Sequence, residues 1–175
     1  MRYRFCPMCG KELKERFSYD EGNVPYCKYD NIMYFDLPKP TVVVAVVKGE
    51  DILLLKQSYI FKNSKVLISG YVSNGETVEE TVYREVKEET GIEIKDIKYL
   101  GSSCLADKEL LMLTYMGYYE SGELTKSPEV EGAAWVNIED ALCQMEEDEV
   151  GKKVVMEVLK EIGYKGKNAY RCEVK

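Results

Sequence analysis

The stretch that decides the fold of this 175-residue chain is GYVSNGETVEETVYREVKEETGI, residues 70–92. Within it, Glu80 follows Thr77 at the spacing of a capping box, in which a hydroxyl and a carboxylate each accept a hydrogen bond from a backbone N–H at a helix start. Gly91 suits the left-handed conformation that closes many helices. The stretch therefore predicts a loop followed by a helix that begins at Thr77 and ends at Gly91.

The predicted helix carries glutamates on the face that should be buried. At about 100° per residue, Val78, Val82 and Val86 form one apolar stripe. Glu89 falls about 20° from Val82, inside that stripe, and Glu85 lies at its edge. Like charges at this i,i+4 spacing repel by about 0.2–0.5 kcal/mol, so a cation is expected beside them. Hard divalent cations such as Mg²⁺ or Mn²⁺ take oxygen ligands and commonly bridge carboxylates to substrate phosphates.

One arginine lies close to these acids in the sequence. Arg84, on the opposite side of the predicted helix, can reach back to Glu76 as a bidentate partner and fix the loop before the helix. The alternative interpretation is a solvated charged face with chance spacing, but a core-facing glutamate such as Glu89 is rarely left unpaired. The segment therefore favours a metal site over a merely solvated helix.

The flanking sequence predicts a mixed α/β domain. Residues 41–47 form a β-branched run typical of a buried strand. Residues 52–56 return as a second strand after a turn, so the two should form a hairpin. Further strands are expected at 66–68, 92–100, 110–119 and 133–136, and helices at 138–145 and 150–162.

Composition excludes several classes of function. The chain has 31 acidic and 24 basic residues, a formal charge of −7, and no histidine. The lack of histidine excludes Ser-His-Asp and Cys-His hydrolysis and imidazole-based zinc catalysis, and the negative charge argues against direct nucleic-acid binding. No apolar run approaches the roughly 18 residues that span a bilayer, and the sequence shows no signal-peptide core. We therefore expect no membrane partner and a cytoplasmic location.

Residues 70–92 match, without a gap, the signature of the Nudix hydrolases: glycine, five residues, glutamate, seven residues, then Arg-Glu-apolar-any-Glu-Glu-any-Gly-apolar. The nine specified positions are filled by Gly70, Glu76, Arg84, Glu85, Val86, Glu88, Glu89, Gly91 and Ile92. This resemblance implies an α/β fold, an α/β/α sandwich around a mixed sheet, which we assign to residues 37–175. It also implies an enzyme that uses Mg²⁺ or Mn²⁺ to cleave a pyrophosphate joining a nucleoside diphosphate to another group.

The same resemblance implies a role for each polar position of the helix. Glu85 and Glu89 would be the main metal ligands, and Glu88 would be a further ligand or a proton acceptor. Glu76 and Arg84 complete the catalytic motif. The metal would neutralise the pyrophosphate, lower the pKa of a bound water and stabilise the leaving oxygen, with no covalent enzyme intermediate.

Two more metal ligands are implied outside the helix. Ser69, just before the signature glycine, would offer its backbone carbonyl to the metal. A further acid usually precedes a downstream tryptophan, and here Glu129 and Glu131 precede Trp135. The spacing favours Glu129; the alternative is that this residue is an ordinary loop acid.

The cysteines near the start of the chain predict a second metal site. Cys6 and Cys9 form a Cys-x-x-Cys knuckle, and Cys27 follows at the spacing expected for a paired knuckle. Asp30 stands at the fourth position, and its carboxylate is a sound zinc ligand. Residues 1–36 are therefore expected to form a small zinc-ribbon-like unit with a structural Zn²⁺; the alternative is a decayed ribbon that folds without metal.

A zinc ribbon followed by a Nudix domain resembles the NADH pyrophosphatase branch of the family. That resemblance implies hydrolysis of NAD(H) or a related dinucleotide to two mononucleotides, and a homodimer. Tyr34 and Phe35 are candidates to stack on a base, with hydrophobic packing as the alternative. The branch carries Ser-Gln-Pro-Trp, associated with dinucleotide selection, where this chain has Ser102-Ser103-Cys104-Leu105, so only Ser102 is retained as a candidate substrate contact.

Because of this departure, two other functions stay open. The first is hydrolysis of a nucleoside diphosphate sugar or another nucleoside diphosphate derivative. The second is a nucleotide-sensing domain that binds without cleaving, although the intact glutamates of residues 85–89 speak against it.

Overall fold

The computed structural model of the chain describes residues 3–125, 127–128 and 130–164. The chain divides into two compact units, Met1–Pro38 and Lys39–Lys175. Within the described ranges, no helix has the length and apolarity that a membrane crossing requires.

The first unit is a small antiparallel sheet. Its strands are β1 (Lys14–Ser18), β2 (Gly22–Cys27) and β3 (Ile32–Met33), paired in that order. Among the described residues of this unit, the buried apolar side chains are Cys6, Val24 and Cys27. So small an apolar core gives little stability by itself, and units of this size usually need a cross-link or a metal.

The second unit is built on one mixed sheet, which has six strands in the described part of the chain. They are β4 (Lys39–Lys48), β5 (Asp51–Lys56), β6 (Ile68–Tyr71), β7 (Glu93–Leu105), β8 (Leu110–Ser121) and β9 (Gly132–Asn137). The order is β7-β8-β4-β5-β9, with β6 also paired to β4. β4 and β8 are parallel. The other pairs are antiparallel, including the predicted β4–β5 hairpin.

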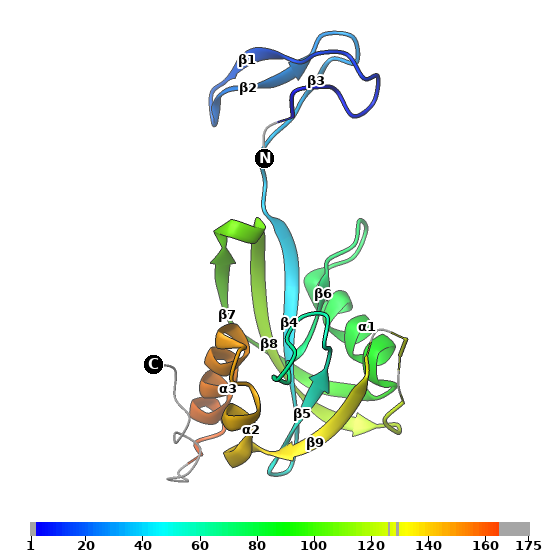
Figure 1. Ribbon diagram of the computed structural model, residues 1–175, viewed down its shortest axis with the longest axis vertical. Helices are drawn as coiled ribbons and strands as arrows, with labels where there is room; N and C mark the ends of the chain where they lie inside the picture. Colours follow the sequence, from blue (N-terminus) through cyan, green and yellow to red (C-terminus); the bar gives the residue numbers. More distant parts are fainter. Residues whose placement is uncertain (1–2, 126, 129, 165–175) are drawn as a thin grey trace. The chain divides into compact units, whose positions relative to one another are not determined.

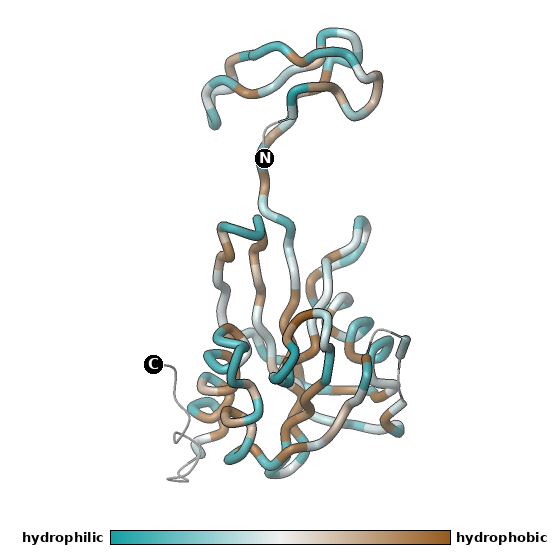
Figure 2. The backbone as a smooth tube through the Cα atoms, in the orientation of Figure 1, coloured by the Kyte–Doolittle hydropathy of each residue, from teal (hydrophilic) through white to brown (hydrophobic). Residues whose placement is uncertain are grey.

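Helices cover both faces of this sheet (Figure 1). They are α1 (Val78–Thr90), α2 (Ile138–Gln144) and α3 (Glu149–Glu161). Successive side chains of a strand point to opposite faces, so β4 is buried on both. Its residues Val42, Val44 and Val46 pack in one apolar cluster with α1, and Val43, Ala45 and Val47 pack in another with α2 and α3. Figure 2 shows β4 and β5 as apolar strands inside this unit. The predicted α/β/α sandwich is confirmed.

The ends of α1 are those that its sequence predicts. The Thr77 hydroxyl accepts a hydrogen bond from the Glu80 backbone N–H at 3.2 Å, and the Thr77 N–H donates to the Glu80 carboxylate at 2.8 Å. Gly91 closes the helix in the left-handed conformation, with φ 77°, and its N–H donates to the Lys87 carbonyl. The two caps fix the length of the segment that carries the glutamates.

Two predicted strands differ from the structure by more than two residues at one end. Val66 forms an isolated bridge with Leu55, and β6 begins only at Ile68, because its residues pair with 41–44 of β4. β7 continues to Leu105 rather than ending at residue 100, because its pairing with β8 extends to the turn between them. Both differences arise from pairing with distant strands.

Candidate active site

The second unit contains a cleft of about 740 Å³, within the usual range for sites that bind small molecules. Arg84, Glu85 and Glu89 of α1 line it together with Ser69 and Gly70 of β6. Much of the remaining lining is apolar and includes Ile60, Phe61, Leu67, Leu105, Leu110 and Met112. The cleft therefore combines a carboxylate-rich surface with an apolar surface.

Gly70 makes room for the carboxylate of Glu85. A Cβ built on Gly70 would lie 1.9 Å from the carboxyl carbon of Glu85, far inside van der Waals contact. The Glu85 side chain is only 12% exposed. The strand must therefore have no side chain at position 70 if Glu85 is to lie against it.

Glu89 is buried beside a second polar side chain. It is 6% exposed, although it is a charged residue in the last turn of α1. The Nε2 amide of Gln57 donates a hydrogen bond to Glu89 Oε1 at 3.1 Å. Glu89 is buried, as its position in the apolar stripe predicted. Gln57 was not predicted, because it lies just past β5 and carries no local signal of this contact.

Arg84 connects the acids of the signature segment. Its Nε and Nη2 contact the two carboxylate oxygens of Glu76 at 2.6 and 3.0 Å, the bidentate pair expected from the sequence. Its Nη2 also donates to the Tyr71 carbonyl at 3.1 Å. Its Nη1 also reaches Glu85 at 2.8 Å and Glu88 at 2.9 Å, two contacts that the sequence did not predict. The long side chain of Arg84 therefore contacts both the loop acid Glu76 and the helix acids Glu85 and Glu88.

The electrostatics of Glu76 reflect this ion pair. The hydrogen bonds from Arg84 lower the pKa of Glu76 from its ordinary value of 4.5 to about 2, with help from the Thr81 hydroxyl and the Ser73 N–H. In return, Glu76 raises the pKa of Arg84. Glu76 is thus a fixed anion that anchors the loop between β6 and α1.

The other predicted metal ligands differ in whether they line the cleft. Ser69 pairs with Val43 of β4 and lines the cleft. The Glu88 side chain is 60% exposed and is absent from the cleft lining, so it contacts the site through Arg84. Glu129 lies outside the described residues. Its neighbour Glu131 accepts hydrogen bonds from the backbone and hydroxyl of Ser58, and the hydroxyl is the main cause of its lowered pKa.

These residues fit a hard divalent cation. The donor set is entirely oxygen, as Mg²⁺ and Mn²⁺ prefer. Glu85 and Glu89 are one helical turn apart, both are largely removed from water, and both line the cleft. Burying carboxylates is costly unless positive charge lies close to them. Arg84 supplies one such charge to Glu85, and a divalent cation would supply more.

The first unit brings the three cysteines and the aspartate together. Ligand atoms of Cys6, Cys9, Cys27 and Asp30 all lie within 4.8 Å of one another. Sγ of Cys9 and Sγ of Cys27 are 3.6 Å apart, close to the roughly 3.7 Å that a tetrahedral Zn²⁺ with bonds of about 2.3 Å imposes on two thiolates. The thiols of Cys6 and Cys27 each donate to Asp30 Oδ2 at 3.1 Å. Hydrogen bonds from the cysteines, Cys9 first, hold the pKa of Asp30 below its usual range.

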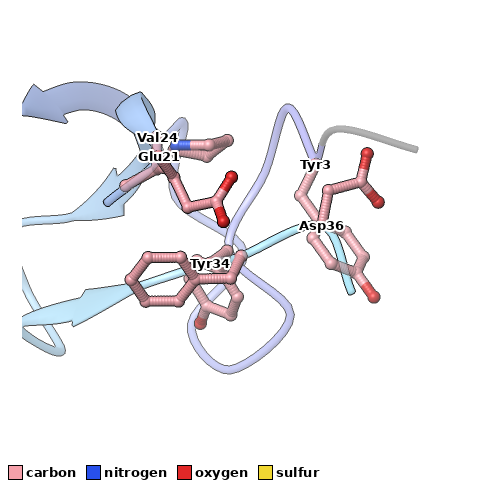
Figure 3. A pocket seen from close by; sticks show the side chains of 7 residues that line it. Tyr3, Glu21, Val24, Tyr34 and Asp36 are labelled. Atoms are coloured by element: carbon pink, nitrogen blue, oxygen red, sulfur yellow. The ribbon is translucent and has the colours of Figure 1, made fainter. Parts of the chain in front are cut away.

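Tyr34 and Phe35 line a hollow of about 40 Å³ beside Tyr3 (Figure 3). That volume suits a water molecule and not a nucleotide base. The Tyr34 hydroxyl lies 3.0 Å from Cys6 Sγ, and its ring packs edge to face with Tyr3 at 5.7 Å. For Tyr34 these contacts favour the packing alternative, and stacking on a base stays a prediction for Phe35, which is 43% exposed.

The segment that departs from the NADH pyrophosphatase pattern lies at the end of β7. Ser102 pairs with Leu113 of β8 and is exposed, outside the cleft lining. Leu105, three residues later, does line the cleft. The apolar member of the altered segment is therefore the one that can contact a substrate.

Comparison with known proteins shows the family of the second unit. A family model for the NUDIX domain matches residues 37–159. The chain therefore belongs to the Nudix family, as its signature indicated. It is 32% identical over 139 residues to the NAD-capped RNA hydrolase NudC of Pseudomonas syringae pv. syringae, covering 79% of this chain and 49% of that protein.

Two further similarities concern the sequence and the fold. The NAD-capped RNA hydrolase NudC of Pectobacterium carotovorum is 34% identical over 134 residues, covering 76% of this chain and 50% of that protein. The chain thus spans about half the length of the curated relatives it matches. The crystal structure of a NUDIX hydrolase from Nitrosomonas europaea superposes with a TM-score of 0.74 at 17% identity, covering 92% of this chain and 94% of the other, which supports the fold.

Proposed function

We propose that this chain is a Mg²⁺- or Mn²⁺-dependent pyrophosphohydrolase that splits NAD(H) or a related dinucleotide into two mononucleotides. The observation that carries the proposal is the pair of carboxylates, Glu85 and Glu89, which lie one helical turn apart and line the cleft. A nucleotide pyrophosphate is doubly anionic, and an acidic cleft can hold it only through a cation.

The residues divide the chemistry as follows. Glu85, Glu89 and the Ser69 carbonyl would hold the metal, with Glu129 as a further ligand and Glu88 as a further ligand or proton acceptor. Mg²⁺ or Mn²⁺, when bound, supplies charge neutralisation, a lowered pKa for the attacking water and stabilisation of the leaving oxygen.

The chain itself orients these groups. Arg84 ties Glu85 to Glu76 and the loop before the helix, and Gly70 leaves space for the Glu85 carboxylate. In the reaction, the oxygen of water forms a bond to one phosphorus while the bridging P–O bond breaks. Two monophosphates result, and the enzyme forms no covalent bond to either.

The relatives' names support a substrate that contains NAD. Both are called NAD-capped RNA hydrolases, so an RNA that carries NAD at its 5′ end joins free NAD(H) as a candidate. The expectation of no direct nucleic-acid binding rested on the charge of −7. It stays a prediction that a capped RNA can test.

A second candidate follows from Leu105. It lines the cleft in the segment where the NADH pyrophosphatase branch carries its Ser-Gln-Pro-Trp sequence. Because the sequence associated with dinucleotide selection is absent there, the second half of the substrate can differ from nicotinamide mononucleotide. A nucleoside diphosphate sugar or another nucleoside diphosphate derivative meets that description.

The first unit has its own proposed role. We propose that Cys6, Cys9, Cys27 and Asp30 bind one structural Zn²⁺, which their geometry supports. Metal analysis of protein purified without chelator should find about one zinc per chain, and a zinc-free but folded unit would favour the decayed ribbon. A homodimer, the boundary near residue 36 and a cytoplasmic location stay predictions.

Substrate identity can be tested with one panel. Purified protein with Mg²⁺ or Mn²⁺ is offered NADH, NAD⁺, NAD-capped RNA, ADP-ribose, nucleotide sugars and triphosphates, and products are identified by mass spectrometry. We expect nicotinamide mononucleotide and AMP from the dinucleotides. Turnover of nucleotide sugars alone would replace the first candidate by the second, and binding without turnover of any compound would favour a nucleotide-sensing domain.

A further inference from the structure

Gln57 is a buried amide that the proposed reaction does not yet use. It is 1% exposed and lies directly after Lys56, the last residue of β5. Removing an amide from water costs free energy unless its polar atoms find hydrogen-bond partners. The burial of Gln57 is therefore expected to depend on a hydrogen-bond partner for its side chain.

The partner of this amide is a proposed metal ligand. Gln57 Nε2 donates to Glu89 Oε1 at 3.1 Å, and the two residues are 32 positions apart in the sequence. Glu89 is itself 6% exposed. A hydrogen bond to a charged acceptor is stronger than a neutral one and restrains the orientation of the carboxylate that accepts it.

The backbone of Gln57 is anchored as well. Its carbonyl accepts hydrogen bonds from the N–H groups of Ile60 at 2.9 Å and Phe61 at 3.3 Å. Ile60 and Phe61 line the cleft. The turn at 57–61 thus holds the backbone of Gln57 in place. Gln57 therefore connects the apolar lining of the cleft, through its backbone, with Glu89 of α1, through its side chain.

We propose that Gln57 is a positioning residue that holds the Glu89 carboxylate in the orientation in which it binds the metal. The inference rests on the proposed function, because it assigns Glu89 to the metal. Hydrogen-bond partners of metal ligands typically change metal affinity about 10- to 100-fold when they are removed. Gln57 acts through Glu89 and touches neither substrate nor water in the reaction.

The test compares Mn²⁺ binding, measured by electron paramagnetic resonance, in the wild type, Gln57→Met and Gln144→Met. Methionine keeps the length of the side chain and removes the donor. Gln144, the other glutamine of the chain, lies on α2 and accepts from Lys65 at 2.6 Å, outside the cleft lining. We expect Gln57→Met to weaken Mn²⁺ binding about 10- to 100-fold and Gln144→Met to leave it unchanged.

A double-mutant cycle shows whether the effect passes through Glu89. In a Glu89→Ala background, Gln57→Met should weaken Mn²⁺ binding no further, because the carboxylate that Gln57 orients is already absent. In turnover assays, Gln57→Met should raise the Mn²⁺ concentration for half-maximal rate and largely retain kcat at saturating Mn²⁺. A purely structural defect would lower kcat at every Mn²⁺ concentration.

A second measurement needs no variant, in case Gln57→Met does not fold. With ¹⁵N-glutamine labelling, the two side-chain amides give separate signals, and Mg²⁺ should shift the Gln57 pair while leaving the Gln144 pair in place. Wild-type Mn²⁺ affinity in a folded Gln57→Met variant, or a Gln57 amide signal that Mg²⁺ saturation leaves unmoved, would overturn the inference alone. A wild-type protein that binds no Mn²⁺ would instead overturn the metal site of the proposed function.

Discussion

Arg84 contacts two acids of the signature segment in different ways. It holds Glu76 in a bidentate pair that fixes the loop, and it holds Glu85 by a single contact that leaves this carboxylate in the cleft lining. Gly70 contributes by having no side chain, and Gln57 contributes a single donor. The site therefore depends on groups that orient carboxylates as much as on the carboxylates themselves.

Gly70→Ala should disable the site without unfolding the protein. The added Cβ would meet the Glu85 carboxyl group at 1.9 Å, and Glu85 would have to leave its place. A displacement of about 1 Å at a catalytic group can cost about 100-fold in rate, so we expect kcat/KM to fall by that order. Gly132→Ala on β9 is the matched control, because a Cβ there meets nothing within 4 Å. Equal activity of the two variants would contradict the role assigned to Gly70.

Glu76→Gln should destabilise the protein in a pH-dependent way. The pKa of Glu76 is lowered from 4.5 to about 2 in the folded state, chiefly by Arg84. A depressed folded-state pKa stabilises the fold above the unfolded-state pKa, and this stabilisation is lost as pH falls toward the folded-state value. The difference in the free energy of unfolding between wild type and variant should therefore be full at neutral pH and shrink between about pH 4.5 and 2. Urea denaturation at several pH values measures it, and a difference independent of pH would refute the ion pair as its source.

α1 is the element that turns these residues into a site. Its length is set by the Thr77–Glu80 capping box and by Gly91, whose Cβ, if present, would lie 2.2 Å from the Thr125 hydroxyl. Its apolar stripe packs Val82 and Val86 against one face of the sheet. The consequence is that Glu85 and Glu89 are presented on the cleft side from a rigid support.

Thr77→Ala should lower the free energy of unfolding modestly by weakening the start of α1. Loss of an N-cap hydroxyl costs about 1 kcal/mol of stability, and the Thr77 hydroxyl accepts from the Glu80 N–H at 3.2 Å. We expect that loss in urea denaturation at neutral pH, with Thr77→Ser near wild type because it keeps the hydroxyl. If Thr77→Ser were as unstable as Thr77→Ala, the cap would not be the reason.

Local signals in the sequence were enough to predict the helix and most strands. The capping box, the left-handed glycine and the spacing of Val82, Val86 and Glu89 are all contained within one segment, and the structure agrees with them. The start of β6 and the end of β7 were wrong because distant strands decide them.

Three features of the site were not predicted from the sequence. Gln57 lies 32 residues from Glu89, so only the folded sheet brings the two together. The contacts of Arg84 with Glu85 and Glu88 were missed because a helical wheel places the Cα atom and not the end of a long side chain. The leucine at 105, rather than Ser102, lines the cleft because strand pairing decides which side chains face it.

Across the whole molecule, the negative charge is concentrated where the site lies. Residues 76–89 contain six glutamates against Arg84 and Lys87, which gives 2 − 6 = −4 out of a total of −7. In the proposed function, that charge repels an anionic substrate from the metal-free cleft, and a bound divalent metal would allow the cleft to hold one. The first unit concentrates a second donor set, three thiols and a carboxylate, in its small core.

The most direct test of the central claim follows the oxygen of water. Wild type and Glu89→Gln are each incubated with NADH and Mn²⁺ in H₂¹⁸O, and the products are weighed by mass spectrometry, with circular dichroism as a control for folding. The wild type should give two mononucleotides, one of which carries a single ¹⁸O, and the folded variant should give neither. Equal turnover by Glu89→Gln, or two mononucleotides without ¹⁸O in either, would contradict hydrolysis at this site.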